Sequence, residues 1–196
     1  MRIKSISSVF ACFLAFSTYA ETITGYVVGI ADGDTITVLD ANRQQHKIRL
    51  AGIDAPENTQ AFGDSSKQNL AAMVFNKTVA VEWDKQDRYG RTVGKVIVNG
   101  VDANAAQIKA GMVWWYEQYH KEQSLEDQRL YEQVEQQAKA QRVGLWRDLS
   151  PMAPWVWRNG GSVEVKQSCP CGSGAACTGS KGGRYCITPT GGKRYK

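Results

Sequence analysis

Residues 21–57 read ETITGYVVGIADGDTITVLDANRQQHKIRLAGIDAPE, and this stretch decides the fold. Its first two β-rich segments, 21–30 and 35–40, flank the sequence Asp32-Gly33-Asp34, and Asp-Gly is a common turn pair. A second turn near Asn42 leads into a third β-rich segment. The stretch therefore predicts three consecutive strands joined by short turns.

Outward from this stretch, the patterns predict two more strands and three helices. The predicted strands are 21–30, 35–40, 47–53, 78–83 and 92–98, and the predicted helices are 65–75, 102–110 and 124–142. This order suits an α+β, mainly β fold: a five-stranded OB-fold β-barrel with about three helices. Side chains fill the inside of so small a barrel, so we expect any active site on its outer surface.

The first 20 residues predict a secretory signal peptide. Arg2 and Lys4 give a positive start, residues 6–16 are apolar, and Thr18 and Ala20 place small residues before a cleavage after residue 20. The apolar run is short for a bilayer span, although a retained anchor is the alternative. We expect the mature protein to be a secreted or periplasmic monomer without stable membrane insertion.

Charge and composition divide the mature chain into a domain at 21–157, a linker at 158–167 and a C-terminal element at 168–196. Residues 21–157 carry 15 Lys and Arg against 18 Asp and Glu, whereas residues 158–196 carry 7 against 1. A mildly acidic domain with a basic tail suggests a polyanionic partner that the tail holds and the domain processes. The segment 150–157, with two prolines and two tryptophans, predicts an extended strap on the barrel.

The small C-terminal tail holds the four cysteines that follow the signal: Cys169, Cys171, Cys177 and Cys186. In an exported chain an even, clustered number predicts two disulfides with three possible pairings. A zinc site is the rival interpretation, although the spacing lacks the usual paired C-x-x-C ligands. Basic and aromatic residues also alternate in this tail, which suits either a clamp on single strands or a plain disulfide-stapled tail.

Charged residues gather at the predicted strand ends. Asp34 and Asp54 flank neighbouring strands, and two carboxylates with carbonyl oxygens and water suit a hard cation such as calcium. Arg49 and Arg91 offer planar guanidinium forks that match phosphate oxygens. Glu57 completes the set as a candidate base. Each feature alone is ordinary turn or loop chemistry, but together they predict phosphoryl chemistry.

Four motifs in order carry a family resemblance: Asp32-Gly33-Asp34-Thr35, Ile48-Arg49-Leu50, Ile53-Asp54-Ala55-Pro56-Glu57 and Asp87-Arg88-Tyr89-Gly90-Arg91. Over residues 25–146 the chain resembles the staphylococcal nuclease, or thermonuclease-like, family. The resemblance implies a calcium-dependent phosphodiesterase that cleaves DNA, RNA or both at the 5′ oxygen and leaves 3′-phosphate ends. A non-catalytic nucleic-acid-binding or envelope module on the same fold is the alternative.

The resemblance also implies roles for individual residues. Asp34, Asp54 and the main-chain carbonyl of Ala55 would bind calcium, with Asp32 as an outer acid. Arg49 and Arg91 would grip the reacting phosphate, Glu57 would activate or position water, and Arg88 and Tyr89 would contact the nucleotide's outer phosphate. The chain departs from the family where Ala55 replaces a threonine and where the loop 58–63 carries no lysine. The aromatic cluster of Trp114-Trp115-Tyr116 and Tyr119 falls where the family has a base-stacking tyrosine. The sequence does not single out which of these residues takes that role.

Overall fold

The structure is a computed structural model that describes residues 21–160, 171–172, 177–178, 184–188 and 193–195. The predicted signal peptide, residues 1–20, lies outside the described residues, as do Cys169 and the predicted linker from residue 161 onward. In the part of the chain that is described, no helix has the length and hydrophobicity to cross a membrane.

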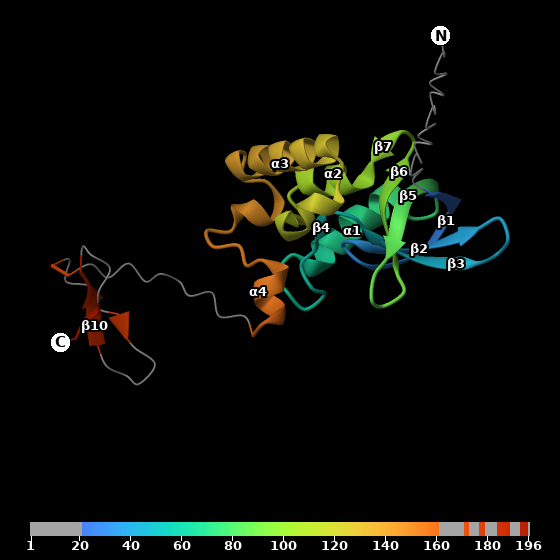
Figure 1. Cartoon of the computed structure of the whole chain (residues 1–196). Coiled ribbons are helices and arrows are strands. Elements are labelled where there is room, and N and C mark those ends of the chain that lie inside the picture. The colour runs from blue at the N-terminus through green and yellow to red at the C-terminus, as the bar shows by residue number, and fades with distance from the viewer. Residues whose placement is uncertain (1–20, 161–170, 173–176, 179–183, 189–192, 196) are drawn as a thin grey trace, which may run out of the picture.

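Five strands form a closed, mixed β-barrel, which confirms the predicted fold class (Figure 1). They are β1 (Glu21–Asp32), β2 (Thr35–Asp40), β3 (Gln45–Leu50), β5 (Thr78–Gln86) and β6 (Thr92–Val98). Neighbouring strands run antiparallel in the order β3-β2-β1-β5-β6, and a parallel pairing of β3 with β6 closes the barrel. In that pairing Arg49 lies beside Val93.

The turn between β1 and β2 is held by the residues that predicted it. The main-chain amide of Asp34 donates a hydrogen bond of 3.0 Å to Oδ1 of Asp32. Gly33 packs directly against Ser66 and Ala55, so that a side-chain carbon at this position would collide with both. The turn is therefore packed between Ala55 and the first helix, which contains Ser66.

Short strands connect the barrel to the helices. The predicted third strand breaks at Gly52, whose φ of 71° is left-handed and favours glycine. Beyond the break, β4 (Ile53–Asp54) pairs with β8 (Trp114–Trp115), while β7 (Val101–Asp102) pairs with β6. Asp54 is thereby fixed outside the barrel sheet.

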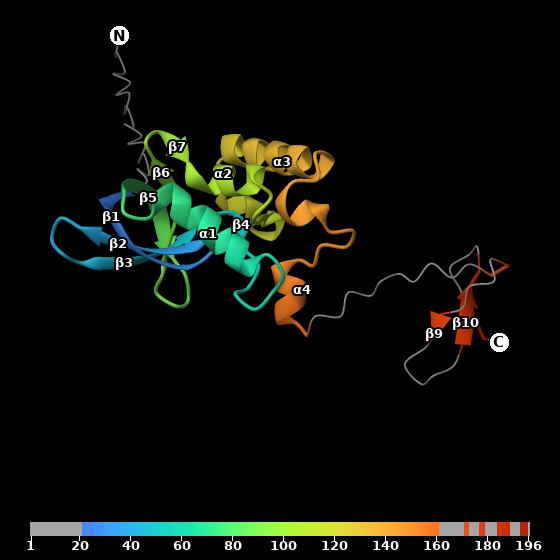
Figure 2. The same cartoon turned by 180° about the vertical axis from the view of Figure 1, so that it is seen from behind.

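The three predicted helices are present as α1 (Gly63–Val74), α2 (Ala103–Lys109) and α3 (Leu125–Ala140). Asp102 and Ser124 cap α2 and α3, because their side chains accept hydrogen bonds from the main-chain amides of Ala105 and Asp127. From behind, α1 crosses in front of the strands (Figure 2). Two 3-10 helices, η1 (Glu117–Glu122) and η2 (Gly144–Arg147), flank α3.

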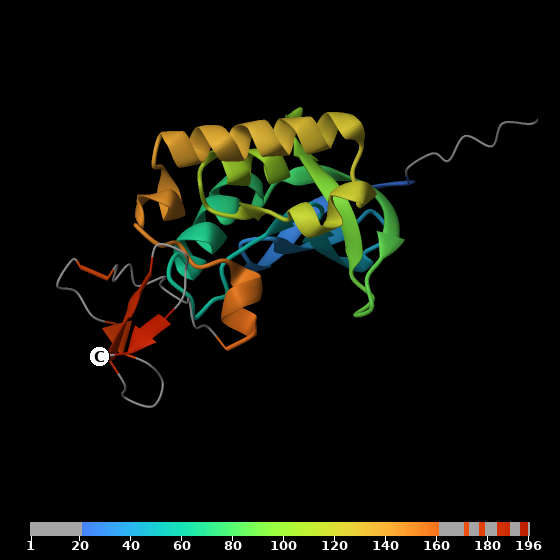
Figure 3. The same cartoon turned by 60° about the vertical axis from the view of Figure 1, so that its left-hand side comes forward.

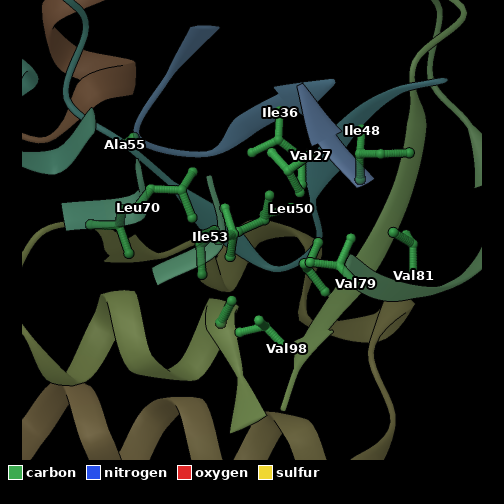
Figure 4. Packing of buried hydrophobic residues seen from close by; sticks show 14 of the residues in the cluster. Val27, Ile36, Ile48, Leu50, Ile53, Ala55, Leu70, Val79, Val81 and Val98 are labelled. Carbon is green, nitrogen blue, oxygen red and sulfur yellow. The ribbon is translucent and has the colours of Figure 1, made fainter. Parts of the chain in front are cut away.

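The hydrophobic core lies between the barrel and these helices (Figure 4). Alternate residues of each strand point inward, among them Ile36 and Val38 of β2 and Ile48 and Leu50 of β3. Leu70 of α1 packs against the same cluster and is fully buried. Each such side chain contributes about 1.5–3 kcal/mol to folding, so the core makes the outer site a rigid platform.

The extended strap predicted at 150–157 is partly wrong. Its second half forms the short helix α4 (Pro154–Arg158), with Pro154 in the first turn. Proline favours that position because its missing amide would lack a partner there anyway. Helix α4 and the long helix α3 lie on different sides of the barrel (Figure 3).

The C-terminal element forms a small sheet of its own, which the sequence did not predict. Its strands are β9 (Cys177–Thr178), β10 (Arg184–Ile187) and β11 (Lys193–Tyr195). A disulfide joins Cys171 to Cys186. This confirms the disulfide interpretation over zinc for these two cysteines, while Cys169 lies outside the described residues and the second predicted disulfide stays a prediction.

Candidate active site

A cleft of about 570 Å³ opens on the outer surface of the barrel. Its walls come from the β1–β2 turn, the end of β3, the loop after β4, the β5–β6 hairpin, η1 and α4. Nine residues singled out in the sequence line this single cleft: Asp32, Asp34, Arg49, Asp54, Ala55, Glu57, Arg88, Tyr89 and Arg91. The fold thus brings together groups that are up to 59 positions apart in the chain.

Two buried carboxylates form the floor of the cleft. Asp34 is 4% exposed and Asp54 is 1% exposed. Arg49 lies between them, with Nη1 2.5 Å from Oδ2 of Asp34 and Nη2 2.9 Å from Oδ1 of Asp54. The contact with Asp34 is an ion pair without hydrogen-bond geometry, whereas the contact with Asp54 is a hydrogen bond.

The floor carries more negative charge than Arg49 can neutralise. Burial raises the pKa of Asp34 to about 7; Arg49 opposes this rise, and the nearby Asp32 and Asp54 add to it. Although burial alone would lower the pKa of Arg49, the surrounding carboxylates hold it above its ordinary value. A further cation at this point would therefore be favoured electrostatically.

The donor set fits a hard divalent cation. Asp34 and Asp54 supply carboxylate oxygens, and Ala55 is placed beside them, because its amide donates a 2.6 Å hydrogen bond to Oδ2 of Asp34. Among the described residues, no three His, Cys, Asp or Glu side chains come close enough to hold a metal by themselves. A cation here would also need main-chain carbonyl and water oxygens, a combination that calcium accepts and zinc rarely uses.

The β5–β6 hairpin contributes the second guanidinium group. Arg91 Nε donates a 2.7 Å hydrogen bond to Oδ2 of Asp87, which fixes the arginine at the start of β6. Arg91 directly precedes β6, whose Val93 lies beside Arg49 across the parallel pairing. Arg49 and Arg91 both line the cleft, one from β3 and the other from the turn before β6.

The tip of this hairpin exposes an aromatic ring. Tyr89 is 68% exposed, and the guanidinium carbons of Arg88 and Arg91 lie 4.8 Å and 5.4 Å from its ring centroid. The hydrogen bond from the amide of Tyr89 to Oδ1 of Asp87 shapes the turn. An exposed ring between two guanidinium groups suits a phosphate-bearing ligand at the rim.

Glu57 also lines the cleft, on the loop after β4. Its side chain is 40% exposed, and its amide donates a 3.1 Å hydrogen bond to Oε1 of Gln60. The carboxylate is thus open to solvent within a fixed loop, as a group that handles water must be.

Sequence reasoning missed Arg158, which was assigned to the linker. Its guanidinium binds both oxygens of Asp54 and one oxygen of Glu57. The hydrogen bonds that Arg158 donates to Asp54 raise the pKa of Arg158 above its ordinary value. No local pattern could have identified it, since 104 residues separate Arg158 from Asp54 and only the tertiary fold joins them.

The residues of the predicted aromatic cluster lie in two different places, some on the cleft wall and some packed against other side chains. Tyr116 and Tyr119 line the cleft, and their rings lie 4.9 Å apart. Trp114 instead packs against Trp146, and Nε1 of Trp115 donates a hydrogen bond to Gln123. The structure therefore puts the two tyrosines, and neither tryptophan of the pair, on the cleft wall.

A barrel with paired carboxylates and guanidinium groups facing one outer cleft suits a phosphate ligand held beside a cation. Comparison with known proteins agrees with this class. The family model described as "Staphylococcal nuclease homologue" matches residues 47–148. This chain belongs to the staphylococcal nuclease family, as its motifs predicted.

Individual relatives match over most of their length. Protein ParB of Escherichia coli is 41% identical over 165 residues, which cover 80% of this chain and 90% of the relative. Micrococcal nuclease of Shigella flexneri is 39% identical over 165 residues, with 80% and 91% covered. An uncharacterized endonuclease of Haemophilus influenzae is 38% identical over 154 residues, with 78% and 83% covered.

Proposed function

We propose that this chain is a calcium-dependent nuclease that hydrolyses phosphodiester bonds of DNA, RNA or both. Family membership makes it a phosphodiesterase of the endonuclease type. The observation that carries the finer assignment is the shared cleft, in which two buried carboxylates lie beside two guanidinium groups. We place the mature protein in the periplasm or the medium, where its disulfide would persist and calcium is abundant.

In this proposal Asp34, Asp54 and the carbonyl of Ala55 hold calcium, with Asp32 behind them. When bound, calcium supplies positive charge that offsets the growing charge of the phosphoryl group. Arg49 and Arg91 bind phosphate oxygens from the other side and orient the ester. Arg88 and Tyr89 contact a neighbouring phosphate at the rim.

Glu57 accepts a hydrogen bond from the attacking water and thereby orients or deprotonates it. General-base help is worth about 10² to 10⁴ in rate, whereas a single arginine contributes about 10³ to 10⁵ in related phosphoryl chemistry. Enzymes that hydrolyse such esters lower the activation free energy by on the order of 20 kcal/mol. The cationic groups therefore supply most of the catalysis, and Glu57 adds a smaller share.

The test is cleavage of DNA and RNA by purified protein in calcium, in chelator, and with Asp54→Asn. We expect cleavage in calcium, none in chelator, and a large loss for Asp54→Asn, because one ligand and one buried charge are removed. Cleavage that persists in chelator would overturn calcium dependence. Binding of nucleic acid without cleavage under every condition would favour the non-catalytic module instead.

A further inference from the structure

Helix α4 adds a fourth guanidinium group to the cleft, after those of Arg49, Arg88 and Arg91. Nη2 of Arg158 lies 2.6 Å from Oδ2 of Asp54, and Nη1 lies 3.2 Å from Oδ1 of the same carboxylate. Nη1 also donates a 2.8 Å hydrogen bond to Oε1 of Glu57. This fork-on-carboxylate geometry is the stronger, bidentate kind of ion pair.

Aromatic packing by Trp155 holds helix α4 in this position. The ring of Trp155 stacks on Tyr116 with centroids 5.3 Å apart and planes 13° apart, and it meets Trp114 edge-on at 5.5 Å. Just before the helix, the carbonyl of Met152 accepts a 2.6 Å hydrogen bond from Nε2 of Gln60. Arg158 therefore extends from an anchored helix rather than from a free surface segment.

Arg158 and a divalent cation would compete for the same oxygens of Asp54. Asp54 is 1% exposed, so few directions remain from which a ligand can reach its oxygens. Oδ1 receives Arg49 and Arg158, while Oδ2 receives Arg158. A divalent cation on Asp54 would need the lone pairs that Arg158 occupies and would repel its positive charge.

We infer that Arg158 is an internal counter-ion that competes with the divalent cation for Asp54 and so sets the calcium concentration at which the cleft loads. This inference rests on the proposed calcium site. Where calcium is scarce, Arg158 compensates the buried charge and keeps the cleft unloaded. Where calcium is abundant, the cation displaces the guanidinium group from Asp54.

The test compares Arg158→Gln with the wild type by calorimetric titration of calcium into the mature chain without nucleic acid. We expect Arg158→Gln to bind calcium about fivefold to tenfold more tightly, since the competing bidentate pair is gone. Arg147→Gln is the matched control, because Arg147 is exposed, lies outside the cleft and loses the same charge. Its affinity should stay within about twofold of the wild type, as expected for a screened surface charge.

Thermal unfolding provides a second measurement. In chelator, Arg158→Gln should unfold at a lower temperature than Arg147→Gln, because Asp54 loses a partner while buried. Saturating calcium should shrink that difference. Equal calcium affinities for Arg158→Gln and Arg147→Gln would overturn the competition while leaving the calcium site intact. No calcium binding by the wild type or either variant would overturn the proposed site and, with it, this inference.

Discussion

Substitutions of the charged cleft residues should lower catalytic activity by different amounts. We expect Arg49→Ala or Arg91→Ala to lower kcat/KM at least as much as Glu57→Gln, because cationic groups outweigh general-base help by about tenfold. Initial rates on one substrate in saturating calcium would check this order, with thermal unfolding to verify that each variant is folded. Loss of all activity in Glu57→Gln, with most retained by both arginine variants, would contradict it.

Far from the cleft, the pair of Asp40 and His46 predicts a pH-dependent stability. The hydrogen bond from His46 lowers the pKa of Asp40, and the main-chain amide of Gln44 lowers it further. A lowered carboxyl pKa adds stability above the ordinary value of 3.8, and this stability is lost as the pH falls through the folded-state pKa.

The variant Asp40→Asn keeps an acceptor for the turn amides but loses the charge. Its deficit in unfolding free energy should be constant near neutral pH and vanish in acid, as measured by urea unfolding across a pH series. Asp84→Asn, on an exposed position of β5, is the control. A deficit that stays the same down to the most acidic sample would show that the charge plays no part.

At the residue scale, the sequence predicted that the candidate site residues of its four motifs would lie together. All nine residues that it singled out line one cavity, because each sits at a strand end or turn whose position the local pattern predicts. Their chemical roles stay predictions. The sequence did not predict Arg158 as a cleft residue. Its position depends on the packing of Trp155 against Tyr116, and a sequence pattern does not show contacts between residues so far apart.

At the element scale, local signals located strands and helices well but not their longest-range pairings. Asp-Gly turns, caps at Asp102 and Ser124, and apolar alternation are all encoded within a few residues. The parallel closure of β3 on β6 and the pairing of β4 with β8 join distant segments. Helix α4 was missed because five residues are too few to establish a helical period.

The wedged turn between β1 and β2 gives an element-scale prediction. Gly33→Ala should destabilise the protein by about 1–3 kcal/mol, because the added methyl group must displace Ser66 of α1 or Ala55. It should also lower activity, since Asp34 is the next residue. Urea unfolding and initial rates would measure both effects.

Gly29→Ala is the control for this prediction, because Gly29 lies in β1 just before the turn and its added carbon would meet Thr37 at an ordinary 3.5 Å. Equal stability of Gly33→Ala and Gly29→Ala would mean that the turn and α1 can separate freely.

At the scale of the whole molecule, the strands of the C-terminal element pair only with one another among the described residues. Deleting residues 168–196 should therefore leave the thermal unfolding of the barrel domain nearly unchanged. If the basic tail grips nucleic acid, the deletion should make the fall of affinity with salt shallower, by about 0.7 in logarithmic slope for each lost contact with a single-strand phosphate. Fluorescence anisotropy in chelator would measure the slope, and an unchanged slope would assign the tail another role.

The walls of the cleft are drawn from nearly the entire domain, from Asp32 in the first turn to Arg158 in the last helix. Ribosomes synthesise a protein from its N-terminus at about 5–20 residues per second. Arg158 is therefore added several seconds after Asp32. During that interval the growing polypeptide lacks part of the cleft wall. The complete cleft can therefore assemble only after helix α4 has been synthesised.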